Sequence, residues 1–270
     1  MMKNTSEFFD LYCVALRSMG MGLTFIFFNE IAIRFHSKLG MALIHSAKGE
    51  ELDDNTVFTI VCQINRNLSS LKQSSSLMRV EVSSLNYKAG IAAMKRSDYV
   101  TASYYLSLST QLLPDNHWLS NYSLSLQVYM ATAKASYSTG DTDKSQAALN
   151  VILKEATCIE DKLDAYHLFV NLLHSQERGE EAYTICQNVL TQLGEKIPEN
   201  VTPEESKAMV QETVSLVKDL SEERLRAMKE MDESAQELLK FFTLLAHVSW
   251  FRRPGVSICR VNLLSCISIL

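Results

Sequence analysis

Apolar residues recur every three or four positions along most of this chain, which is the spacing of an amphipathic helix. Residues 1–50 predict two helices, the second over about residues 29–46. Another helix is predicted from about Asp53, with Asp54 or Asn55 as its cap and a buried face of Val57, Ile60, Val61 and Ile64. The serine-rich run 65–76 lacks the spacing, and we expect it to be a loop.

From Leu77 onward the pattern predicts helices in pairs, each pair joined by a tight turn. Proline cannot donate the helical hydrogen bond, so Pro114 ends the first pair, and Gly140 ends a helix as C-terminal glycines do. The expected pairs are 83–95 with 99–113 across Ser97-Asp98, 118–139 with 143–156 across Gly140-Asp141, and 161–176 with 180–193 across Arg178-Gly179.

Two further helices are expected after the pairs. Thr202 and Pro203 predict the cap and first turn of a helix to about Leu220, and another is expected from Ser221 to about Trp250. The sequence thus predicts an all-α fold in which antiparallel hairpins stack, because one hairpin cannot cover its own apolar faces. We divide the chain into three parts. Residues 1–76 are N-terminal helices and a polar loop that form the end of a preceding module, residues 77–250 are a repeat domain, and residues 251–270 are a poorly defined tail.

Residues 86–114 resemble the tetratricopeptide repeat, and the resemblance implies a tetratricopeptide-like α-solenoid. Asn86 stands where that family has tryptophan, and Ala93 where it has its first tyrosine, so the aromatic wedge is missing. The positions that match the repeat here and in the two later pairs are Ala89, Gly90, Tyr99, Ala102, Leu106, Pro114, Ala133, Gly140, Leu149 and Ala182.

Residues 31–246 also resemble, more narrowly, a helical spacer found after the AAA-type ATPase module in large multidomain serine/threonine-kinase, GAF and histidine-kinase-like signalling proteins. The strings that carry this resemblance are residues 35–40 (FHSKLG), 63–66 (QINR) and 112–118 (LLPDNHW), together with the Gly140-Asp141 turn. The resemblance implies a non-catalytic protein-interaction or scaffold segment, whose partners are neighbouring domains or peptides. Residues 251–270 do not share it.

Composition narrows the class of function. A formal charge of -5 lacks the Lys and Arg excess that nucleic-acid binding needs, so we expect no nucleic-acid partner. The six cysteines have no paired spacing, which is typical of a reducing compartment, and we expect a cytoplasmic protein. These cysteines are Cys13, Cys62, Cys158, Cys186, Cys259 and Cys266.

The sequence contains no phosphate-binding glycine loop and no kinase motif, so we expect neither an enzyme nor a cofactor. His167 and His174 share a helix face, with Cys158 and Cys186 near the ends of that hairpin. Their spacing is not that of zinc ligands, so we interpret them as a polar face and expect no metal.

Four points stay open. One set of aromatic residues either lines a ligand groove or packs between helices. One set of cationic residues either binds an acidic peptide or only keeps the protein soluble. These sets are Tyr99, Tyr104, Tyr105, Trp118, Tyr122 and Tyr129, and Lys88, Lys95, Arg96 and Lys134. The apolar segment from Phe8 to Phe28, although interrupted by Asp10 and Arg17, allows a membrane-associated helical adaptor as the alternative function. The fourth is that the chain is a regulatory fragment, which competes for a longer protein's partner.

Overall fold

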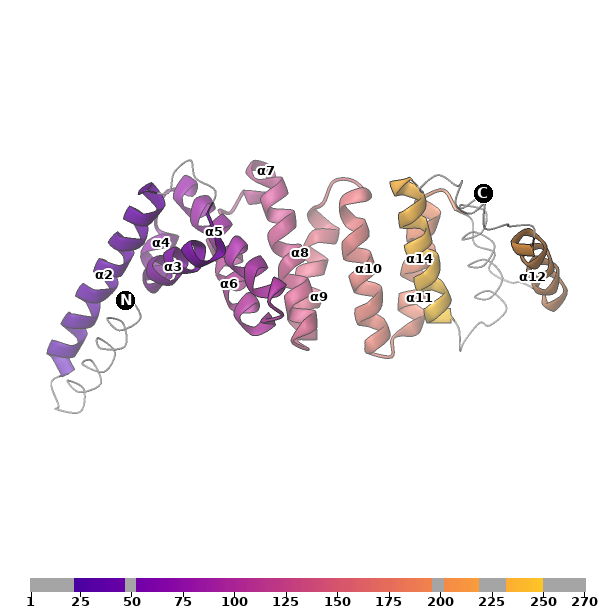
Figure 1. Cartoon of the computed structure of the whole chain (residues 1–270), viewed down its shortest axis with the longest axis horizontal. Coiled ribbons are helices and arrows are strands. Elements are labelled where there is room, and N and C mark those ends of the chain that lie inside the picture. Colours follow the sequence, from indigo (N-terminus) through magenta and orange to yellow (C-terminus); the bar gives the residue numbers. More distant parts are fainter. Residues whose placement is uncertain (1–21, 47–51, 196–201, 219–231, 250–270) are drawn as a thin grey trace. The chain divides into compact units, whose positions relative to one another are not determined.

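The computed structural model describes residues 22–46, 52–195, 202–218 and 232–249, and every regular element in these ranges is helical (Figure 1). The expected all-α class is therefore confirmed for this part of the chain. The chain divides into two compact units, residues 1–135 and 136–270, with the division near the end of helix α8 (Tyr122–Ser138). Each unit has an apolar core of its own.

The first unit contains α2 (Gly22–Ser46), α3 (Asp54–Ile64), the 3-10 helix η1 (Asn65–Asn67), α4 (Leu68–Lys72), α5 (Ser76–Lys95), α6 (Tyr99–Leu112), α7 (His117–Ser120) and most of α8. The second contains α9 (Thr142–Glu155), α10 (Glu160–Ser175), α11 (Gly179–Gln192), α12 (Pro203–Lys218) and α14 (Glu233–Ser249). Residues 1–21, the proposed helix start at Ser221 and the tail after Ser249 lie outside the described ranges.

The predicted helix α3 is confirmed, with a different cap. Asp53 is the cap residue, since its carboxylate accepts a hydrogen bond from the Thr56 amide at 2.9 Å. The four predicted core residues of α3 are buried together with side chains of α2, α4, α5 and α6. Helices α3 and α4, which the sequence assigned to a preceding module, thus share one core with the α5–α6 hairpin.

The prediction of a loop over residues 65–76 is wrong, because η1, α4 and the first residue of α5 occupy it. Leu71 is buried in the core of the first unit, and Leu68 packs against that core. Burial of these two leucines stabilises the helical turns, although the segment is rich in serine. The polar residues act as caps: Asn67 accepts from the Ser70 amide, and Ser75 accepts from the Met78 amide. Helix α5 consequently begins before the predicted Ser83.

Helices α5 and α6 form an antiparallel hairpin, as three contacts along them show. Arg79 donates to the carbonyl of Leu112 at 3.1 Å, and the buried Ser83 and Ser109 hydroxyls each donate to the other's carbonyl, at 2.9 and 2.8 Å. Farther along α5, Gly90 lies against Leu106. Residue numbers rise along α5 as they fall along α6, so the two helices run in opposite directions.

The predicted helix over 118–139 is wrong in one respect, because it is broken at Asn121 into α7 and α8. Asn121 has an extended φ of -142° while its amide donates to the carbonyl of His117 at 2.8 Å, which closes the short helix. Ser125 then donates to the carbonyl of Asn121 at the start of α8.

Three helix-to-helix turns share one backbone geometry. Each has a residue at positive φ, Ser97 (59°), Gly140 (78°) or Glu177 (61°), followed by the residue that precedes the next helix. The amide of that following residue donates to the carbonyl five positions back, to Ala93, Ser136 or Leu173, which is the bond that closes a Schellman motif. The third turn therefore centres on Glu177 and Arg178, while Gly179 is the first residue of α11.

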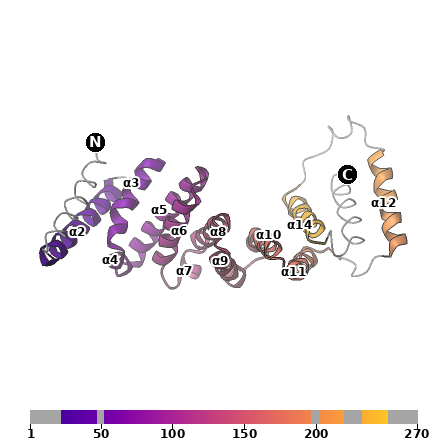
Figure 2. The ribbon, with the colours of Figure 1, turned by 90° about the horizontal axis from the view of Figure 1, so that it is seen from below.

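In the second unit, α10, α11 and α14 surround one core and appear nearly end-on at the corners of a triangle in Figure 2. The rings of His167 and Phe241 are in contact, as are those of His174 and His247, so α10 and α14 run parallel. Helix α11 follows α10 after a short turn and is antiparallel to both. It is α14 that packs against α11, although α12 follows α11 in the sequence.

Helix α12 begins as predicted with a reciprocal cap. The Thr202 hydroxyl accepts from the Glu205 amide at 3.3 Å, and the Glu205 carboxylate accepts from the Thr202 amide at 2.8 Å. This is a capping box, which satisfies two amides that have no partner inside the helix.

Candidate functional site

The repeat positions taken from the sequence lie mainly inside the helix packing. Ala89, Ala102, Leu106, Ala133, Leu149 and Ala182 are all fully buried, and Gly90 and Pro114 are buried as well. Tyr99 is half-buried and Gly140 is exposed at its turn. Most of these residues therefore contribute to packing between helices. Their assignment to a repeat stays a prediction.

Among these positions, Gly90 of α5 lies in close contact with Leu106 of α6. A Cβ atom added at position 90 would lie 2.6 Å from Cγ of Leu106, well inside van der Waals contact. Leu106 is fully buried, so its side chain has little room to move. Glycine is therefore required at this position for the two helices to pack at their observed distance.

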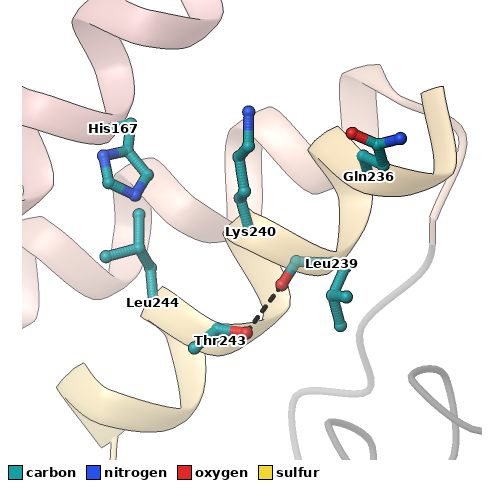
Figure 3. Close-up of a pocket in the computed structure, with 6 residues that line it drawn as sticks. All are labelled: His167, Gln236, Leu239, Lys240, Thr243 and Leu244. Atoms are coloured by element: carbon teal, nitrogen blue, oxygen red, sulfur yellow. Dashed lines mark hydrogen bonds between the residues drawn. The ribbon is translucent and has the colours of Figure 1, made fainter. Parts of the chain in front are cut away.

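The candidate site is a pocket in the second unit, between α10 and α14, with a volume of about 390 Å³. Figure 3 shows His167 of α10 facing Lys240 and Leu244 of α14. The side chains that line it are His167, Gln236, Leu239, Lys240, Thr243 and Leu244. Apolar walls with a few polar groups are the usual composition of a site for a small ligand or a partner's side chain.

Helical spacing explains why α14 lines this pocket. Residues 236, 239, 240 and 243 are three or four apart and so share one face, while the adjoining face of Phe241, Phe242 and Leu245 is buried in the core. Thr243 is exposed and its hydroxyl donates to the carbonyl of Leu239 at 2.8 Å. The core side of α14 fixes the helix, and its other side lines the pocket.

The charge in the pocket is balanced. The ammonium group of Lys240 donates a hydrogen bond to the carboxylate of Glu237, and this bond, helped by the charges of Asp164 and Glu233, raises the pKa of Lys240. Lys240 is thus held as a cation beside carboxylates. The pocket therefore offers apolar contacts and polar groups at its rim, without a strong net charge.

The four residues considered for a metal site are not brought together as a set. Cys186 is fully buried, and desolvation raises the pKa of its thiol to about 12, so it stays protonated. Cys158 is exposed. His167 lines the pocket, and His174 instead meets His247 of α14, a neighbour that spacing within one hairpin could not reveal.

Of the six aromatic residues, five lie in ring clusters of the first unit. Trp118 contacts Tyr122 and Tyr129, with ring centroids 5.8 and 5.6 Å apart. Tyr105 is buried against Phe58 and Tyr104, and burial, with a hydrogen bond to Cys62, raises its pKa. These contacts are packing between helices and between neighbouring residues, which agrees with the packing interpretation of the aromatic set.

The cationic set is divided by the structure. Arg96 pairs with Asp54 at 3.3 Å and lies over the ring of Phe58, 5.4 Å from its centroid, so it braces α5 against α3. Lys88, Lys95 and Lys134 are exposed. The proposed clamp therefore has Arg96 engaged within its own unit.

Within the described ranges, no helix combines the length and apolar character needed to cross a bilayer. Residues 8–21 of the apolar N-terminal segment lie outside these ranges. Comparison of the sequence with models of known protein families gives no match, and comparison with curated proteins gives no relative.

Proposed function

We propose that this chain is a non-catalytic protein-interaction segment, which holds a partner protein through the pocket between α10 and α14. The observation that carries the proposal is the position of that pocket between two parallel helices. His167 comes from one helix and the other five lining residues from the second, so both helices must be in register for the pocket to exist.

The arrangement of α10, α11 and α14 supports a stacked-hairpin architecture. When antiparallel hairpins stack in the same orientation, their first helices run parallel and the second helix of one hairpin packs against both. The three helices have this relation, and the three turns at Ser97, Gly140 and Glu177 have a common geometry. A tetratricopeptide-like solenoid over residues 77–250 is the architecture that we propose on this basis.

The occupant that fits the pocket is a short segment of another protein with an apolar side chain. Leu239 and Leu244 supply apolar walls, whose contact with such a side chain removes both from water. Gln236, Thr243 and His167 place hydrogen-bonding groups around it, which suit the backbone of a bound peptide. The paired charges of Lys240 and Glu237 favour neither a strongly acidic nor a strongly basic peptide.

The resemblance to the spacer of ATPase-containing signalling proteins extends the proposal. By that resemblance the partner is a neighbouring output or switch domain in the cytoplasm, and the chain acts as a scaffold between them. The proposal requires binding without turnover.

The test fills the pocket without touching the core. Thr243→Arg places a long cation at the rim of the pocket, and Thr184→Arg on α11 is its matched control. Both threonines are exposed, and both donate to the carbonyl four residues earlier at 2.8 Å. The two variants should unfold alike, because each replaces an exposed threonine on a helix and removes the same kind of hydroxyl hydrogen bond.

The full chain and both variants are used to capture partners from a cell extract, followed by mass spectrometry. We expect one set of proteins to be retained by the wild type and by Thr184→Arg and to be lost with Thr243→Arg. Equal capture by all three, or no capture by any, would reject the pocket as the interaction site.

A further inference from the structure

Two imidazole rings meet on the surface of the second unit. His174, in the last turn of α10, and His247, in the last turn of α14, have ring centroids 4.9 Å apart and an interplanar angle of 71°. Both side chains are exposed to solvent. Neither residue lines the pocket between α10 and α14.

We propose that His174 and His247 together bind a divalent transition-metal ion of the Zn²⁺, Ni²⁺ and Cu²⁺ class. Imidazole nitrogen is a preferred ligand of these ions, whereas Mg²⁺ and Ca²⁺ prefer oxygen. The site is independent of the partner-binding pocket, so either proposal can fail without the other.

The separation of the rings fits chelation of one ion. With metal–nitrogen bonds of about 2.0–2.1 Å, two imidazoles on one ion have centroids about 4.5 Å apart at a right angle and about 5.2 Å apart at the tetrahedral angle. The observed 4.9 Å lies between these limits. The backbones of α10 and α14 thus already hold the two rings at a chelating distance.

Only rotation of the rings is needed to direct a nitrogen of each toward a common ion. In the edge-on arrangement the edge of one ring faces the other ring. The torsion that turns an imidazole about its Cβ–Cγ bond is broad, so exposed rings reorient at small cost. The helices themselves do not have to move.

Water completes the coordination. In the described part of the chain, no group of three or more His, Cys, Asp and Glu side chains gathers as a metal cluster. A site with two protein ligands binds an exchangeable ion, unlike the closed four-ligand sites that hold structural zinc. The proposed site is therefore one that responds to the concentration of metal.

Binding at this site would fasten α14 to α10. The two ligands come from different helices that are far apart in the sequence, so the pair exists only while these helices are packed together. An ion that binds the folded form and not the separated helices stabilises the packed form by mass action. Metal binding should consequently raise the melting temperature of the second unit.

The test is a calorimetric titration of the full-length chain with Zn²⁺, beside the variants His174→Ala, His247→Ala and His45→Ala. His45 is an exposed histidine in the last turn of α2 and serves as the matched control. Loss of a mere supporting partner of a ligand weakens metal binding about 10–100-fold, so loss of a ligand itself should weaken it at least as much. All three changes are at exposed positions and should leave the fold intact.

We expect reversible binding of one Zn²⁺ that is lost equally in His174→Ala and His247→Ala and kept in His45→Ala. Zn²⁺ should also raise the melting temperature of the wild type and of His45→Ala only, and Mg²⁺ should raise none. Thiols bind Zn²⁺ too, but they are the same in every variant, so the difference between variants reports the histidine pair. Equal Zn²⁺ affinity in all four proteins, or no binding by the wild type, would overturn the proposal.

Discussion

Gly90 of α5 packs against Leu106 of α6 so closely that a Cβ atom at position 90 would lie 2.6 Å from Cγ of the leucine. Leu106 belongs to a cluster with Ala93, Ala102, Ala131 and Ala135, all small residues. Small side chains on each of these helices let the backbones approach one another. The hairpin therefore depends on the absence of side-chain volume at particular positions.

Gly90→Ala should destabilise the chain. Overpacking a buried contact costs about 1–3 kcal/mol, and the better helix propensity of alanine returns about 1 kcal/mol, so we expect a net loss of about 1 kcal/mol. Urea unfolding of the full chain measures it. In a Leu106→Ala background the clash is relieved, and the same Gly90→Ala change should then stabilise. A stabilised single variant would contradict the packing argument.

Asn86 of α5 is a polar residue that forms hydrogen bonds inside the first unit. It is fully buried and exchanges two hydrogen bonds with Asn65, at 2.7 and 3.1 Å, and donates to the carbonyl of Val82 at 2.9 Å. Asn86→Ala should cost about 2–3 kcal/mol, because it removes these bonds and leaves partners unsatisfied. Asn65→Ala should cost less, since Asn65 is only half-buried.

The pair Asn65 and Asn86 should also be coupled. In a double-mutant cycle the two costs should fail to add by about 1 kcal/mol, because each single change already breaks the shared bonds. Denaturant unfolding of the four proteins gives the coupling. Strict additivity would mean that the two amides do not stabilise one another.

In the three turns of common geometry, introducing a glycine and removing one should have opposite effects on stability. Ser97 and Glu177 are non-glycine residues in the left-handed region, while Gly140 occupies the equivalent place in the second turn. Ser97→Gly and Glu177→Gly should each stabilise by about 0.5 kcal/mol, because relief of the backbone strain exceeds the added entropy of the unfolded chain. Gly140→Ala should destabilise by about 1 kcal/mol.

Melting temperatures of these turn variants provide the measurement. All three positions are exposed, so side-chain packing contributes little to the comparison. If Gly140→Ala had no effect, the left-handed conformation would not be important for that turn.

The cap of α6 should make stability depend on pH. Hydrogen bonds from the hydroxyl and amide of Thr101 lower the pKa of Asp98 from its ordinary value of 3.8. Since the folded pKa is below the unfolded one, the ionised carboxylate contributes stability above the unfolded value, and this is lost as the pH falls through the folded pKa. Asp98→Asn keeps an acceptor but does not titrate in this range.

We therefore expect the wild type to melt above Asp98→Asn near neutral pH and the two melting temperatures to converge in acid, below about pH 4. Asp115→Asn, at an exposed position after α6, is the control for a lost charge. A difference between wild type and Asp98→Asn that stays constant with pH would show that the carboxylate does not act through its charge.

Local features of this protein were readable from its sequence. The periodicity that buries Val57, Ile60, Val61 and Ile64 predicted α3, and Pro114 and Gly140 correctly marked helix ends. Thr202 and Pro203 signalled the start of α12. Each of these depends on hydrogen bonds and side-chain spacing within a few residues, so neighbouring positions in the sequence carry the information.

Other features were decided by packing between distant segments. Residues 65–76 are polar in composition, yet Leu68 and Leu71 fold them against a core supplied by other helices. Three contacts have no local signal in the sequence. They are the hydrogen bonds between the amides of Asn65 and Asn86, the ring contact of His174 with His247, and the packing of α14 against α10 and α11. Which apolar faces cover one another is fixed by shape and volume in three dimensions, and periodicity within one helix specifies only that a face must be covered.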